Sequence, residues 1–293
     1  MGFVNLLRYC LLTRERCPLK VVLFGLLLLV APLSVPTYAT RETPFSQEAK
    51  AILEHNFPSA NISYLLLDAS GSVLAERWTP QQAIPFGSLM KPFLAVAYGE
   101  QHDGSFPKVR CLGTKSHCWF PGGHGSLDLE EAIADSCNAY FLKLADGLDR
   151  QRAAQTFARY DLAGPPLEAK AESLIGLGTE WVESPLTLSR AYLIIDREQQ
   201  LRIQGRIING MLESASRGTA RGVDASVGKN SSLAKTGTAA CTHRPQGAAD
   251  GFAIVLYPAS QPRLLLLVRV HGITGAECAK VAGAMLRSLG AGV

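Results

Sequence analysis

The hydrophobic pattern of the chain changes period twice along its length, and this change constrains the fold more than any other feature. Residues 62–78 (ISYLLLDASGSVLAERW) carry two apolar runs around the turn-forming letters DASGS, which predicts a β-hairpin. Three further strand-like runs lie at 231–240, 250–260 and 263–272, and PASQP joins the last two as a hairpin. The simplest packing is a single antiparallel sheet built from both ends of the chain, flanked by helices.

The residues between these strands have a helical pattern, so we expect an all-helical lobe inserted into an α/β fold of the α+β type. Ser88 is expected to cap one helix, Pro185 occupies the first turn of another, and Ser126 with Glu130 and Glu131 resembles a capping arrangement. The segments expected to be helical are 46–57, 86–100, 125–148, 183–200, 204–216 and 275–290. Without a repeat or linker, residues 40–293 are predicted to form one domain of catalytic size.

The first 39 residues have the pattern of a targeting segment. Four basic residues between positions 8 and 20 precede an apolar stretch from Val21 to Val35, and small residues at 37 and 39 make a cleavage site. The stretch has about 15 residues, whereas a bilayer span needs roughly 20. We therefore predict a secretory signal peptide, with an uncleaved N-terminal membrane anchor as the alternative. In both cases residues 40–293 are exported, to the periplasm or the outer face of the cytoplasmic membrane, and only residues 20–39 contact the membrane.

The formal net charge is +4, and much of it lies in this head. The rest of the chain shows no basic stripe interleaved with aromatic residues, so nucleic acid is not an expected partner.

Five of the seven cysteines lie beyond the head. In an exported chain, CLGTKSHC predicts a local loop closed by a disulfide between Cys111 and Cys118. A zinc site that uses His117 and His124 is the alternative, but structural zinc sites usually show paired C-x-x-C or H-x-x-x-H spacing. The remaining three cysteines, at 137, 241 and 278, then include a free buried thiol, and Cys137 is interpreted as a packing residue.

Three short motifs follow one another in the part of the chain that carries chemistry. FGSLMK places Ser88 three residues before Lys91, and positions i and i+3 of a helix share one face. Such a pair alone arises often by chance. An S-x-N and a K-T-G-T-A motif follow it in order, and they contain Ser136, Asn138, Lys235, Thr236, Gly237 and Thr238. The ordered set is far more specific than any one of its members.

With these motifs, the chain resembles the penicillin-binding transpeptidase and serine β-lactamase superfamily from about residue 45 to its C-terminus. Residues 218–239 look like the family's G-T-A stretch leading into K-T-G-T-A, and residues 174–192 look like its G-x-G followed by a T-P-L-Q-x-A-x-A-Y helix. Ser184, Thr187 and Ser189 depart from that second pattern. The resemblance implies the sheet with a helical lobe described above, and a nucleophile that opens a helix between the two parts.

The resemblance also implies a role for each motif residue. Ser88 would attack an acyl carbonyl and Lys91, if neutral, would be its base. Ser136 would relay a proton to the leaving nitrogen, Asn138 would orient Lys91 or the substrate amide, and Lys235 would be the second cation that lowers the pKa of Lys91.

The resemblance assigns substrate binding to the third motif, K-T-G-T-A. Lys235, Thr236 and Thr238 would bind the terminal carboxylate of the substrate, and the backbone N–H groups of Ser88 and Thr238 would form the oxyanion hole. Gly237 lies between the two threonines. Arg217, just before G-T-A, is either a surface charge or a second contact to the carboxylate. Neither a cofactor nor a metal is expected.

Several activities share such a site. A D,D-transpeptidase or D,D-carboxypeptidase acts on peptidoglycan stem peptides and is inhibited covalently by β-lactams. A serine β-lactamase, class D-like from the letters W-V-E, and a non-catalytic sensor or scaffold are the alternatives. Asn138 contradicts class D, which has S-x-V, and the E-x-x-L-N loop of class A is not found around Glu168 and Glu172. We therefore predict a compact, stand-alone penicillin-binding transpeptidase, with a protein of cell-wall synthesis as a partner.

Overall fold

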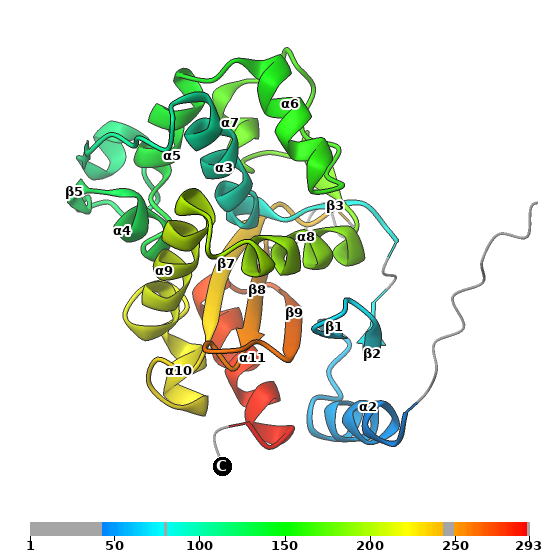
Figure 1. Ribbon diagram of the computed structural model, residues 1–293. Coiled ribbons are helices and arrows are strands. Elements are labelled where there is room, and N and C mark those ends of the chain that lie inside the picture. Colours follow the sequence, from blue (N-terminus) through cyan, green and yellow to red (C-terminus); the bar gives the residue numbers. More distant parts are fainter. Residues whose placement is uncertain (1–42, 79–80, 243–248, 292–293) are drawn as a thin grey trace, which may run out of the picture. The chain divides into compact units, whose positions relative to one another are not determined.

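The computed structural model describes residues 43–78, 81–242 and 249–291, which belong to one compact unit, Arg41–Val293 (Figure 1). The predicted signal peptide or anchor therefore lies outside the described residues. Among the helices that are described, none combines the length and the apolar character needed to cross a membrane.

Strands from both ends of the chain form one antiparallel sheet, as the sequence predicts. The order is β2-β1-β9-β8-β7, and β1 joins the N-terminal hairpin to the C-terminal strands by pairing with β9, with Tyr64 opposite Val268. The five strands are β1 (Ile62–Asp68), β2 (Val73–Arg77), β7 (Leu233–Ala239), β8 (Asp250–Tyr257) and β9 (Leu264–His271). β7, which carries the K-T-G motif, is therefore an edge strand, and its free edge is open to the helical part.

The two faces of the sheet bury separate hydrophobic cores. Tyr64 and Leu66 pack on the face covered by α2 (Pro44–Asn56), α10 (Arg221–Val227) and α11 (Gly275–Ser288). Leu65 and Leu67, their neighbours in β1, pack on the opposite face against the helical part. The near-continuous apolar run of β1 thus reflects burial on both faces of the sheet.

The helical part lies between β2 and β7 in the sequence and includes two small two-stranded sheets, β3–β6 and β4–β5. Pro185 occupies the first turn of α8 behind the N-cap Ser184, as the sequence predicted, whereas α9 begins at Arg202, two residues before the expected Gln204. The elements of this part are β3 (Ile84–Pro85), η1 (Gly87–Met90), α3 (Lys91–Gln101), β4 (Val109–Cys111), η2 (Gly113–Ser116), β5 (Gly125–Leu127), α4 (Leu129–Ala134), α5 (Asn138–Asp146), α6 (Arg150–Arg159), α7 (Ala171–Leu174), β6 (Val182–Glu183), α8 (Pro185–Arg197) and α9 (Arg202–Ser216).

Two helix predictions were wrong in detail. Ser88 does not cap a helix: it lies inside the 3₁₀ turn η1, and α3 begins only at Lys91, with Pro92 in its first turn. The expected helix 125–148 is two helices, because the backbone of Ser136 turns to a φ of 52° between α4 and α5. The N-cap of α4 is Asp128, whose side chain accepts a hydrogen bond from the backbone N–H of Glu131, and Ser126 belongs to β5.

Candidate active site

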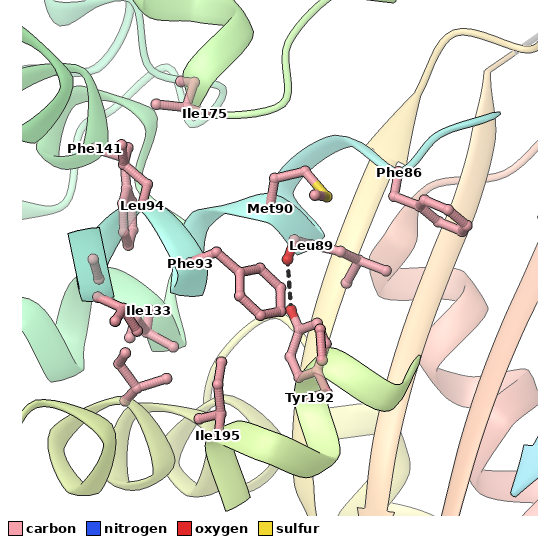
Figure 2. Close-up of a cluster of buried hydrophobic side chains, with 14 of the residues drawn as sticks. Phe86, Leu89, Met90, Phe93, Leu94, Ile133, Phe141, Ile175, Tyr192 and Ile195 are labelled. Carbon is pink, nitrogen blue, oxygen red and sulfur yellow. Dashed lines mark hydrogen bonds between the residues drawn. The ribbon is translucent and has the colours of Figure 1, made fainter. Parts of the chain in front are cut away.

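The Ser88 turn is held between the sheet and the helical part by buried side chains. Leu89, Met90 and Phe93 are fully buried on this segment, and Tyr192 of α8 reaches it from below in Figure 2. The hydroxyl of Tyr192 donates a hydrogen bond of 2.7 Å to the backbone carbonyl of Leu89. A fully buried hydroxyl that satisfies a turn carbonyl fixes the position of the turn. Ser88, the half-buried member of the turn, lines a cavity.

Two fully buried lysines meet at the hydroxyl of Ser136. The Nζ of Lys91 donates to the carbonyl oxygen of Ser136 at 2.7 Å and to Oδ1 of Asn138 at 2.6 Å, and it lies 3.5 Å from Oγ of Ser136. The Nζ of Lys235 donates to the same Oγ at 2.8 Å and to the carbonyl of Thr236 at 2.9 Å. The structure thus brings together the three motifs, which lie far apart in the sequence.

Burial of this pair favours the neutral amine. It lowers the pKa of Lys91 to about 7. Burial, and next the charge of Lys91, lower the pKa of Lys235 well below its ordinary value. An ammonium group without solvent is destabilised, and a second cation nearby adds repulsion. Lys91 can therefore be an uncharged base near neutral pH, which is the protonation state that activation of a serine needs.

The cavity beside this pair has a volume of about 350 Å³. Six of the predicted site residues line it: Ser88, Ser136, Asn138, Thr236, Gly237 and Thr238. Lys91 and Lys235 do not line it, but both contact Ser136, which does. The other lining residues are Trp119, Leu177, Thr219, Thr274, Gly275 and Ala276, which the sequence did not predict as site residues.

The wall formed by β7 is built from close backbone approaches and hydroxyl contacts. A Cβ at Gly237 would lie 2.3 Å from the carbonyl oxygen of Phe86, so only glycine allows the strand to pass the Ser88 turn this closely. The hydroxyl of Thr236 donates to that of Thr219 at 2.7 Å, and that of Thr238 accepts the N–H of Gly275 at 3.0 Å. The G-T-A letters were the sequence signal for Thr219. The oxyanion hole at Ser88 and Thr238 stays a prediction.

Arg217 does not line this cavity and is paired with acidic side chains. It is hydrogen-bonded to Glu213 and lies 3.7 Å from Asp135. This pairing supports the reading of Arg217 as a surface charge.

The expected disulfide between Cys111 and Cys118 is not formed. Both are buried and neither forms a disulfide, and the same holds for the cysteines at 137, 241 and 278. Cys111 and Cys118 lie instead with His124 and Cys137 in one group whose ligand atoms are within 4.8 Å of one another. Among the described residues, His124 but not His117 therefore lies at a potential metal site, and Cys137 is buried beside it.

No model of a protein family matches the chain, and no curated protein sequence matches it. Several solved structures do match the fold of the chain. Pseudomonas aeruginosa PBP2, solved in complex with WCK 5153, is 18% identical with a TM-score of 0.68, over 85% of this chain and 73% of that one. The transpeptidase domain of Burkholderia pseudomallei penicillin-binding protein 3 is 17% identical with a TM-score of 0.66, over 83% and 92%.

Helicobacter pylori PBP2, solved in complex with MreC, is 16% identical with a TM-score of 0.68 over 83% of this chain. The match spans 62% of the Helicobacter chain. The chain therefore has the fold of penicillin-binding transpeptidase domains, as the sequence motifs predicted.

Proposed function

We propose that this chain is an exported serine acyltransferase that acts on peptidoglycan stem peptides, as a D,D-transpeptidase or D,D-carboxypeptidase, and that binds penicillin covalently. The observation that carries the proposal is the hydrogen-bonded group formed by Lys91, Ser136 and Lys235 behind a cavity lined by Ser88. The likeness in fold to penicillin-binding transpeptidase domains supports it.

The contacts of Lys91 support its role as the base. When neutral, its amine has two N–H bonds and one lone pair. The carbonyl of Ser136 and Oδ1 of Asn138 accept at 2.7 and 2.6 Å, so they can take both N–H groups. The lone pair is then left for a hydroxyl proton. Asn138 accordingly orients the base rather than reacting itself.

In the proposed acylation, Lys91 removes the hydroxyl proton of Ser88 while Oγ bonds to the acyl carbonyl carbon. The carbonyl oxygen becomes an oxyanion, which backbone N–H groups can stabilise by about 3 kcal/mol for each donor. Collapse of this intermediate breaks the C–N bond. The leaving nitrogen receives a proton from Ser136, and Ser136 regains one from Lys91, whose Nζ lies 3.5 Å from its Oγ and carries the proton taken from Ser88. The product is an ester on Ser88, which an amine or water then cleaves.

The composition of the cavity supports a long-lived ester over rapid hydrolysis. Among the described residues that line it, none has a carboxylate that could activate water. Fast β-lactam hydrolysis requires such a base or an equivalent. We therefore rank a transpeptidase above a serine β-lactamase.

Export and a partner complete the proposal. Residues 1–39 would direct the chain to the periplasm or the outer face of the membrane. Two structural neighbours are a PBP2–MreC complex and a peptidoglycan synthase complex, which supports a partner protein of cell-wall synthesis for this chain as well.

The test is covalent labelling of the full-length chain by a fluorescent penicillin, followed over time by denaturing gel and intact mass. Wild type and the matched control Ser105→Ala, an exposed serine outside the cavity, should form a stable adduct, and Ser88→Ala should not. An adduct that disappears in seconds while excess penicillin is consumed would identify a β-lactamase. Folded protein with neither adduct nor hydrolysis would leave a non-catalytic binding domain.

A further inference from the structure

Four possible metal ligands converge beside the S-x-N turn from separate elements. Cys111 ends β4, Cys118 follows η2, His124 precedes β5 and Cys137 lies between α4 and α5. The three cysteines are buried and the histidine is partly buried. Buried thiols and an imidazole are the ligands of structural zinc sites of the Cys₃His type.

The distances between the ligand atoms fit a single tetrahedral ion. Zinc binds sulfur at about 2.3 Å and nitrogen at about 2.0–2.1 Å, so the edges of a tetrahedron are about 3.8 Å between two sulfurs and about 3.5 Å between sulfur and nitrogen. The Sγ atoms of Cys118 and Cys137 are 3.8 Å apart. Nδ1 of His124 lies 3.5 Å from Sγ of Cys118 and 3.6 Å from Sγ of Cys111. We propose that these four residues bind one zinc ion.

The same comparison excludes a second group of potential ligands. Cys241, Asp250 and His271 also lie within 4.8 Å of one another. However, Nδ1 of His271 is 2.8 Å from Oδ1 of Asp250, which is a hydrogen-bond distance. Two ligands of one tetrahedral zinc would be about 3.3 Å apart. Asp250 and His271 therefore form a hydrogen-bonded pair near Cys241. Of the two groups, only Cys111, Cys118, His124 and Cys137 have distances that fit a zinc ion.

Four protein ligands close the coordination sphere, so the ion holds structure and does not perform chemistry. It ties residues 111–124 to the turn that contains Ser136 and Asn138. Trp119, within this loop, lines the cavity, and its Nε1 donates at 3.2 Å to the carbonyl of Ser136. That carbonyl is also an acceptor for Lys91. Zinc would thus hold the loop and the S-x-N turn in the positions that acylation needs; this second step rests on the proposed function.

The metal is measured directly on the full-length chain, purified under reducing conditions. Native mass spectrometry should show an equimolar amount of zinc, and cobalt(II) in its place should show the absorption bands of tetrahedral cobalt–thiolate coordination. Cys111→Ser and Cys137→Ser should lose the metal, whereas Cys278→Ser, a buried cysteine of α11, should keep it. Wild-type protein that takes up neither ion, or variants that retain zinc, would overturn the site. The cobalt spectrum of the wild-type protein tests the metal site even if a cysteine variant fails to fold.

Acylation then tests the link to the active site. Removing zinc from wild type with a chelator should slow labelling by fluorescent penicillin about tenfold or more, and added zinc should restore it, as for other residues that support a site through a metal. Unchanged labelling after complete loss of zinc would overturn the link. If the zinc-loaded protein forms no adduct at all, the proposed function fails while the metal content still stands, so the two failures are distinguishable.

Discussion

The pH dependence of acylation is the most direct test of Lys91 as the base. Its pKa of about 7 follows from complete burial. Below that pH the neutral fraction falls about tenfold for each pH unit, and the rate that depends on it should fall equally. Above about pH 7 the rate should level off, because nearly all of Lys91 is already neutral.

The assay is the second-order rate of labelling of Ser88 by fluorescent penicillin between about pH 5 and pH 8. Because Lys91 and Lys235 share Ser136, the midpoint belongs to the pair. Lys91→Arg separates the roles: arginine keeps the charge but cannot lose its proton, so labelling should vanish at every pH. A rate that stays constant over this range, or near-normal labelling by Lys91→Arg, would refute the mechanism.

The same burial makes the stability of the protein depend on pH with a defined sign. The pKa of Lys91 is 10.5 when unfolded and about 7 when folded, so between these values the unfolded chain binds the extra proton. Below about pH 7 the buried charge costs up to about 5 kcal/mol, and this cost fades as the pH rises toward 10.5. Methionine carries no charge, so the Lys91→Met variant does not pay the cost of burying an ammonium group. The difference in free energy of unfolding between Lys91→Met and wild type should therefore shrink with rising pH, as measured by urea unfolding; a constant difference would contradict the burial of a charge.

Three further substitutions test particular contacts. Tyr192→Phe should lower the free energy of unfolding by about 1–3 kcal/mol in urea titrations, because the buried carbonyl of Leu89 loses its donor; an unchanged midpoint would contradict this role. Gly237→Ala should abolish penicillin labelling, since the new methyl group would meet the carbonyl of Phe86 at 2.3 Å; normal labelling would show that β7 can shift. Arg217→Ala should label as fast as wild type because its partners lie outside the cavity, and a slower rate would point to contact with the substrate carboxylate.

The sheet could be predicted because its signals are local in the sequence, whereas the roles of Lys91 and Lys235 followed from the resemblance of three separate motifs to one family. The apolar runs around DASGS and PASQP predict the two hairpins. Pairing between β1 and β9 is then the simplest way to combine the two hairpins into one sheet. The motifs at Ser88, Ser136 and Lys235 combine residue types that are informative only together. Once the fold brings them side by side, their contacts follow from side-chain length and burial.

Other features could not be read from local patterns. Propensity treats residues 125–148 as one helix, because leucine, alanine and glutamate outweigh the three residues, 135–137, that separate α4 from α5. The sequence offered a zinc site near Cys111, Cys118 and His124 only as an alternative to a disulfide, and it did not include Cys137. The four ligands lie at separate positions, with longer spacings than the compact pairs typical of zinc sites. The thiols of Cys111 and Cys118 are near each other in sequence, which favours a disulfide until Cys137 is seen to join them.

The break at Ser136 connects these observations. A serine with a φ of 52° is strained by roughly 1–3 kcal/mol, and such a conformation persists only where its surroundings fix it. Here Lys91 and Trp119 donate to its carbonyl and Lys235 donates to its hydroxyl. Two of these donors, Lys91 and Lys235, are groups that the proposed acylation uses, so the contacts that hold the strained turn also assemble the candidate site. The next residue, Cys137, places a ligand in the proposed zinc site, which would fix the turn from its other side. Zinc binding would give the cysteine within S-x-N a physical role, and replacing Cys137 should then disturb the turn that holds Ser136 and Asn138.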